Sequence, residues 1–198
     1  MKSRLAATLE QIAADLDDLA VRWALVGGLA VSSHVEPRTT RDVDIAVDLS
    51  SDREAERLVF ELTRRGYSVA ATVEQKRLGR LATVRLRPPG GGRAIPVVDL
   101  LFSSSSIEPE TVASADRIEV LSGVVVPVAR LPHLIAMKVL ARDDRHRPQD
   151  WDDLKALTTA SSNADLDEAR ALLRLIEARG AQRGRDLLQG LESVLDED

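Results

Sequence analysis

Two short motifs in the first quarter of the chain carry residue types that suit phosphate and metal chemistry. Gly27 and Gly28 end one apolar run, and Asp42-Val43-Asp44 opens another. Side chains on a strand alternate between faces, so Asp42 and Asp44 point the same way, about 7 Å apart. Two such carboxylates can share a hard cation, and a glycine turn lets backbone N–H groups approach a phosphate. A divalent ion beside a phosphate cradle is the equipment for phosphoryl or nucleotidyl transfer.

A third acid, Asp99, lies within the apolar run from Pro96 to Phe102, which predicts a buried strand. A lone carboxylate in such a strand is costly to bury unless it is paired or bound to a metal. If this strand lies beside the one that carries Asp42 and Asp44, three carboxylates converge. Each motif alone also has an ordinary interpretation, because a Gly-Gly pair is usually only a turn and an Asp-x-Asp can be a solvated strand edge.

The order of these motifs resembles a known superfamily, the DNA polymerase β-type nucleotidyltransferases. The resemblance rests on Val26-Gly27-Gly28-Leu29-Ala30, Arg38-Thr39-Thr40-Arg41-Asp42-Val43-Asp44 and Asp99. A narrower resemblance, to the AbiEii/AbiGii toxin-type nucleotidyltransferases, rests on Lys138, Arg142 and the stretch from Arg147 to Leu154. Together they cover residues 20 to 158. The broad superfamily often has Gly-Ser where this chain has Gly27-Gly28, whereas the toxin-like subgroup tolerates Gly-Gly.

The resemblance implies transfer of a nucleoside monophosphate from an NTP to an acceptor hydroxyl. Two Mg²⁺ ions are expected. Their ligands, which are also the expected catalytic residues, are Asp42, Asp44 and Asp99. The residues expected to bind the nucleotide are Gly27, Gly28, Arg41, Lys138, Arg142, Asp150 and Asp153. The narrower resemblance implies the toxin of a bacterial toxin–antitoxin or phage-defence pair, with RNA such as a tRNA 3′ end as acceptor and an antitoxin protein as partner. The alternatives are an antibiotic-type small molecule or a protein as acceptor, or an inactive binding module.

Lys138 belongs to a predicted helix and falls on its apolar side with Leu134 and Ile135. A buried ammonium needs a partner. An NTP triphosphate would serve, and so would Asp150, or the side chain could extend to solvent. Asp150 and Asp153 lie three apart on one helix face, where they either orient Lys138 or Arg142, hold the nucleotide, or favour the helix dipole.

Composition sets limits on partners and location. The chain has 198 residues, 44% of them hydrophobic, a net charge of −5 and no cysteine, which excludes disulfides and favours the cytoplasm. No apolar stretch has membrane-spanning length, so no membrane partner is expected. The acidic balance argues against a general nucleic-acid binder, yet residues 64–93 hold eight basic residues against Glu74. This segment either follows an RNA backbone or is a solvated strand face.

The pattern predicts an α/β (α+β) fold, with a mixed-sheet nucleotidyltransferase core over residues 1–128 and a helical C-terminal subdomain over 129–198. Expected helices cover 3–20, 29–34, 52–65, 131–142, 148–160, 164–178 and 181–195. Expected strands cover 22–26, 42–49, 67–73, 80–87, 94–102 and 124–128.

Overall fold

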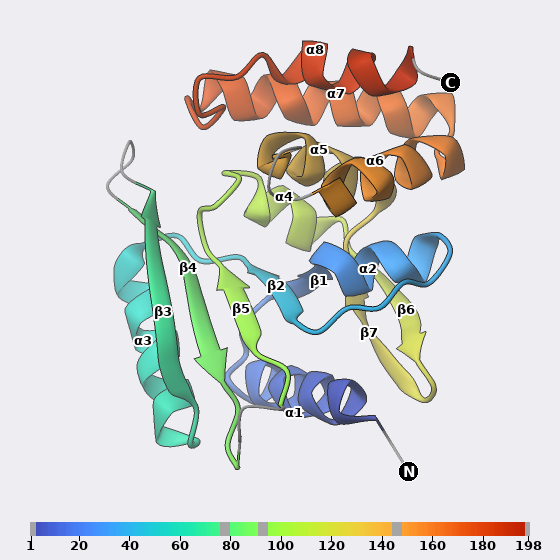
Figure 1. Ribbon diagram of the computed structural model, residues 1–198. Helices are drawn as coiled ribbons and strands as arrows, with labels where there is room; N and C mark the ends of the chain where they lie inside the picture. The colour runs from blue at the N-terminus through green and yellow to red at the C-terminus, as the bar shows by residue number, and fades with distance from the viewer. Residues whose placement is uncertain (1–2, 76–79, 91–94, 144–147, 197–198) are drawn as a thin grey trace.

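The computed structural model describes residues 3–75, 80–90, 95–143 and 148–196 (Figure 1). The helices are α1 Arg4–Asp18, α2 Gly27–His34, α3 Asp52–Arg64, α4 Glu108–Ala113, α5 Leu131–Ala141, α6 Pro148–Ala160, α7 Asn163–Ala178 and α8 Leu187–Leu195. The strands are β1 Trp23–Val26, β2 Val43–Val47, β3 Ser68–Gln75, β4 Arg80–Arg87, β5 Val98–Leu101, β6 Asp116–Leu121 and β7 Val124–Val128.

The strands form one seven-stranded mixed sheet in the order β3-β4-β5-β2-β1-β7-β6. The pairs β2–β5 and β1–β7 are parallel, and the other neighbours are antiparallel. The three central strands β5, β2 and β1 are almost wholly buried, which matches their continuous apolar runs. The predicted mixed sheet is confirmed, and its middle carries Asp44 and Asp99, with Asp42 one residue before β2.

Amphipathic helices cover the sheet as their sequence patterns predict. Leu9, Ile12 and Leu16 of α1 are each 0% exposed because they repeat along one helix face. The hydroxyl of Ser51 accepts a hydrogen bond from the backbone N–H of Glu54 and caps the start of α3, as predicted. These helices hold the sheet that positions the candidate site.

The C-terminal part of the chain is helical, as predicted. In Figure 1, α7 and α8 lie side by side over α5 and α6, which in turn lie over α2 and α4. α5 packs against both α6 and α7, and α2 contacts α5 and α6. The predicted division between residues 128 and 129 falls between β7 and α5, and as a domain boundary it stays a prediction.

Two elements were not predicted from the sequence. The first is α4, whose Glu108 is 0% exposed and accepts hydrogen bonds from the N–H and hydroxyl of Ser105. The Ser105-x-x-Glu108 spacing is that of a helix-start motif and could have revealed this helix. The second is β6, which forms a hairpin with β7 around Gly123, a glycine with φ 78°. Ser122-Gly123 was the available turn signal.

Helix α8 begins later than expected, at Leu187 rather than residue 181. The intervening turn contains three residues with positive φ, namely Gly180, Arg183 and Gly184. Asp186 then caps the helix by accepting a hydrogen bond from the N–H of Gln189. The left-handed turn therefore interrupts what the apolar pattern predicted as one longer helix.

Candidate functional site

The site begins where β1 passes directly into α2. Gly27 has φ 65°, and a Cβ added there would overlap the carboxylate oxygen Oδ2 of Asp44. Asp44 lies beside this turn because β1 and β2 are antiparallel with Val26 opposite Asp44. Glycine is therefore required at position 27 both for the backbone conformation and for the close approach of the carboxylate.

Strand register brings the acids together. β2 and β5 are parallel with Asp44 opposite Asp99, so the two side chains lie next to each other on one face of the sheet. Asp42 lies one residue before β2. Burial, followed by the negative charges of Asp99 and Asp42, raises the pKa of Asp44 to about 6. The charges of Asp99 and Asp42 are thus close enough to disfavour the ionisation of Asp44.

Arg85, which sequence reasoning did not assign to the site, binds these acids. Because β4 pairs with β5 so that Arg85 lies opposite Asp99, the guanidinium reaches both oxygens of that carboxylate. Nε and Nη2 donate at 2.8 and 2.6 Å to Oδ1 and Oδ2 of Asp99, and Nη2 lies 3.7 Å from Oδ2 of Asp42. The hydrogen bonds to Asp99 are the main cause that raises the pKa of Arg85.

The donor chemistry of the three acids suits the expected metal. Carboxylate oxygens favour a hard divalent cation, so the donor types of Asp42, Asp44 and Asp99 suit Mg²⁺. Within the described parts of the chain, no three His, Cys, Asp or Glu side chains are arranged to hold one ion together. Arg85 occupies both oxygens of Asp99 instead. The three-carboxylate metal site stays a prediction.

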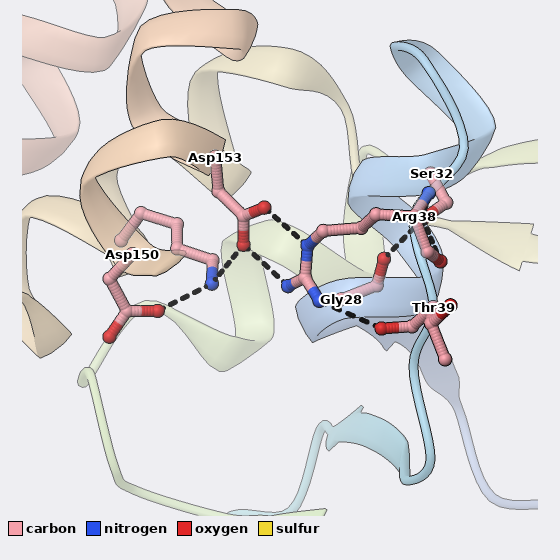
Figure 2. Close-up of polar contacts among 7 residues, drawn as sticks. Gly28, Ser32, Arg38, Thr39, Asp150 and Asp153 are labelled. Atoms are coloured by element: carbon pink, nitrogen blue, oxygen red, sulfur yellow. Dashed lines mark hydrogen bonds and ion pairs between the residues drawn. The ribbon is translucent and has the colours of Figure 1, made fainter. Parts of the chain in front are cut away.

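A second charge cluster joins the loop before β2 to the C-terminal helices α5 and α6 (Figure 2). Asp153 of α6 accepts from Nε of Arg38 at 2.5 Å and from Nη2 at 2.6 Å. Its Oδ2 also lies 2.7 Å from Nζ of Lys138, which pairs with Oδ1 of Asp150 at the same distance. Burial raises the pKa of Asp153, but the hydrogen bonds from Arg38 and Lys138 outweigh it, so the pKa is lowered.

This second cluster also shapes the glycine turn. A Cβ added at Gly28 would lie 2.9 Å from Nη2 of Arg38 and 3.1 Å from the hydroxyl of Thr40. Figure 2 shows Arg38 lying across Gly28 at the start of α2. Arg38, held by Asp153, therefore packs against the turn that sequence reasoning assigned to phosphate binding. The Arg38-Thr39-Thr40 motif was noted in the sequence, but the partner of Arg38 lies 115 positions away.

These groups line one cleft of about 830 Å³ between the sheet and the helical half, a usual size for a ligand site. Of the residues predicted to form the site, the cleft is lined by Gly27, Gly28, Arg41, Asp42, Asp44, Asp99, Lys138 and Asp150. Asp153 lies behind them and is 3% exposed. It contacts Arg38 and Lys138, which line the cleft, and so holds these two side chains in place.

Arg142 is placed differently from the prediction. Its guanidinium lies 4.1 Å from the ring centre of Trp151 and donates from Nη1 to the carbonyl of Gly190 and the hydroxyl of Ser193. It therefore contacts α8 and is not among the residues that line the cleft. Trp151 and the α8 contacts could not be inferred from the Lys138-to-Arg142 spacing.

The basic segment 64–93 is mostly neutralised within the fold. Arg64 pairs with Glu61, Arg65 with Asp15 and Asp18, Arg80 with Asp52, and Arg85 with Asp99. Arg87 is exposed at the end of β4. Lys76, Arg77 and Arg93 lie outside the described residues. Among the described members, this segment is therefore a set of intramolecular ion pairs more than a free basic surface.

The fold is that of a nucleotidyltransferase, as solved structures show. An antigenic nucleotidyltransferase-like protein from Paracoccidioides brasiliensis is 20% identical, with TM-score 0.53 over 96% of this chain and 92% of that one. The antibiotic-resistance factor ANT(2'')-Ia is 15% identical, with TM-score 0.58 over 91% of this chain and 95% of its own. The structure of ANT(2'')-Ia in complex with adenylyl-2''-tobramycin is also similar. It is 14% identical, with TM-score 0.58 over 90% of this chain and 100% of its own.

A family model described as nucleotidyl transferase AbiEii toxin, type IV toxin–antitoxin system, matches residues 10–198. The chain belongs to this AbiEii family and is a nucleotidyltransferase, as the motifs predicted. None of the curated proteins compared with it matches in sequence. No helix in the described ranges has the length and apolar character to span a bilayer.

Proposed function

We propose that this nucleotidyltransferase transfers a nucleoside monophosphate from an NTP to a hydroxyl of an RNA acceptor, such as a tRNA 3′ end, with Mg²⁺. In this proposal it acts as a toxin that a cognate antitoxin neutralises. The observation that carries it is the joint placement of the Gly27-Gly28 turn and of Asp42, Asp44 and Asp99 in one cleft. RNA as acceptor is supported by membership of a toxin family.

The proposed reaction exchanges a phosphoanhydride bond of the NTP for a phosphodiester bond to the acceptor. The acceptor oxygen forms a bond to the α-phosphorus of the NTP. The bond from that phosphorus to the oxygen that bridges it to the β-phosphate breaks, and pyrophosphate leaves with the electron pair. The proton of the acceptor hydroxyl passes to a carboxylate oxygen of the cluster that Asp99 forms with Asp42 and Asp44. Asp42, Asp44 and Asp99 would hold Mg²⁺, which when bound supplies charge stabilisation to the attacking and leaving oxygens.

The remaining residues of the cleft bind and orient the substrate. Backbone N–H groups of the Gly27-Gly28 turn, at the start of α2, face the phosphates. Arg41 and Lys138 line the same cleft. Because Lys138 is already paired with Asp150 and Asp153, its first role is to position those acids and, through Asp153, Arg38.

The test offers labelled NTPs, with Mg²⁺, to the protein together with total RNA, an aminoglycoside mixture or lysate protein in parallel. Label in the RNA fraction, lost in Asp44→Ala, is the expected result. Label in the aminoglycoside fraction alone would favour the activity of the antibiotic adenylyltransferases that share the fold. Label in protein alone would favour protein nucleotidylation. No label in any fraction, with no binding of Mg²⁺–NTP by calorimetry, would favour an inactive binding module.

The toxin role has its own test. Expression without the antitoxin should slow the growth of the host, and Asp44→Ala should relieve the effect at equal protein level. Harmless expression of an enzyme that is active in the labelling assay would contradict the toxin role and leave the transfer activity standing.

A further inference from the structure

Among the described residues, five cationic side chains line the cleft, and they differ in whether an acid already neutralises them. They are Arg38, Arg41, Arg85, Lys138 and Arg183. Arg38, Arg85 and Lys138 each form an ion pair with an aspartate at 2.7 Å or less. Among the described residues, no carboxylate lies within ion-pair distance of Arg41 or Arg183. These two are therefore the cations with charge available for a substrate anion.

Arg183 comes from the part of the chain that sequence reasoning treated as a structural helix. It lies in the turn between α7 and α8 and has φ 56°, next to Gly184 with φ 74°. The left-handed conformation is unfavourable for a residue with a Cβ, and such residues gather at functional sites. The turn therefore holds an arginine where a glycine or asparagine would fit with less strain.

The side chain of Arg183 reaches across to the loop that follows β5. Its Nη2 donates to the carbonyl of Ser104 at 2.7 Å, and Ser104 lines the same cleft. Ser104 comes five residues after Asp99 on one continuous segment. Arg183 is thus one of the residues from the C-terminal helical part of the chain that line the cleft, and it is hydrogen-bonded to the segment that carries Asp99.

The local environment favours an anion at this guanidinium. Arg183 is exposed overall, and the partial burial of its side chain, followed by the positive charge of Arg185, lowers its pKa. The negative charge of Glu108 acts in the opposite direction. A guanidinium remains charged in proteins and has five N–H donors, of which the carbonyl of Ser104 takes one. A phosphate is the anion that such a donor set binds best.

We propose that Arg183 is a phosphate-binding residue of the cleft, which binds a phosphate of the NTP or of the RNA backbone. The proposal rests on the proposed function, because it deepens the account of the same cleft. It also gives the turn between α7 and α8 a part in substrate binding. Arg41, which also lines the cleft and precedes Asp42 in the chain, would bind the same ligand.

The experiment measures the affinity of the protein for two ligands that both carry phosphate groups. Mg²⁺–inorganic triphosphate, titrated by calorimetry, reports on the triphosphate without a base. Unfractionated tRNA, followed by fluorescence anisotropy at several salt concentrations, reports on the RNA backbone. The variants are Arg183→Asn, which tolerates the left-handed backbone, and Arg183→Lys, which keeps the charge. The matched control is Arg174→Gln, an exposed arginine of α7 that does not line the cleft.

The expected result is a loss of roughly tenfold in the affinity of Arg183→Asn for one of the probes, about the effect of one charged hydrogen bond. Arg183→Lys should retain most of the affinity, and Arg174→Gln should match the wild type. A loss confined to triphosphate assigns Arg183 to the NTP. A loss confined to tRNA assigns it to the RNA backbone. In that case the slope of log K against log salt concentration should also fall in magnitude by about one.

Two results would overturn the assignment, and only one of them would also contradict the proposed function. If wild type and Arg183→Asn bind both probes equally, only the role of Arg183 is wrong. If the wild type itself binds neither probe, the proposed function fails and the assignment fails with it. Thermal melting of each variant shows that it is folded; Arg183→Asn loses the hydrogen bond to Ser104 but relieves backbone strain, so its melting temperature should stay close to that of the wild type.

Discussion

Arg85 of β4 binds both carboxylate oxygens of Asp99 of β5, at 2.8 and 2.6 Å, in the middle of the candidate active site. A positively charged group thus already lies on one of the three acids expected to hold Mg²⁺. Binding of a divalent cation to Asp99 must compete with this guanidinium.

Removal of Arg85 should therefore tighten metal binding to the free protein. We expect Arg85→Gln to bind Mn²⁺ roughly tenfold more tightly, the low end for a charged hydrogen bond because the Arg85 side chain is 45% exposed. Electron paramagnetic resonance of free Mn²⁺ measures this at pH 8. Arg87→Gln is the control, since Arg87 lies two residues along the same strand and is exposed. Equal or weaker binding by Arg85→Gln would contradict the competition.

Gly27→Ala should displace Asp44 and abolish activity. The added Cβ would overlap the Asp44 carboxylate, and φ 65° adds backbone strain. Gly123→Ala separates these two effects, because Gly123 has φ 78° and nothing lies within 4 Å of the place that its new methyl group would take. We expect Gly123→Ala to cost about 1 kcal/mol of unfolding free energy and Gly27→Ala clearly more. Urea unfolding measures both, and equal losses would argue against the close contact with Asp44.

Lys138→Met should destabilise the protein in the absence of any ligand. Its side chain is 13% exposed and neutralises Asp150 and Asp153, so its removal leaves buried carboxylates without this partner. The expected loss is about 3–5 kcal/mol of unfolding free energy. Lys138→Met combined with Asp150→Asn should recover part of it. A variant of unchanged stability that loses only the shift in melting temperature caused by Mg²⁺–NTP would instead make Lys138 a direct ligand of the triphosphate.

Asp15 should make stability depend on pH in the acid range. Burial raises the pKa of Asp15, but hydrogen bonds from Gln11, Arg65 and Tyr67 outweigh it and lower the pKa below its usual 3.8. The stabilisation is therefore fully present above about pH 4 and is lost as the pH falls through the lowered pKa.

Tyr67→Phe tests this dependence, because the hydroxyl of Tyr67 donates to Asp15 at 2.8 Å. We expect a loss of about 1.5–3 kcal/mol at pH 7 that shrinks towards pH 2, measured by urea unfolding at each pH. Glu56→Gln, an exposed carboxylate of α3, should show no such trend. A loss that is the same at pH 2 and pH 7 would mean that the hydroxyl acts through packing and not through the charge of Asp15.

The sequence by itself determined the local chemistry of the site. Acids on otherwise apolar strands, such as Asp99, and a glycine pair at a strand end are signals within a few residues. The period-two alternation of a strand predicted Asp42 and Asp44 on one side, although β2 begins at Val43, one residue after Asp42. Helix caps such as Ser51 and the apolar faces of the helices follow from equally short-range rules, so most elements were predicted within a few residues.

Only the tertiary structure decided which charges meet. Arg85 contacts Asp99 because β4 lies beside β5 in the sheet, and Arg38 contacts Asp153 because α6 packs over α2. Arg183 reaches the cleft because a left-handed turn separates α7 from α8. Ion pairs depend on distances of a few ångströms between residues far apart in the chain, and strand order and helix packing set those distances. Spacing along the sequence therefore predicted the acids of the candidate site and offered Asp150 as one partner of Lys138, but it did not predict that Arg85 pairs with Asp99 or that Arg38 pairs with Asp153.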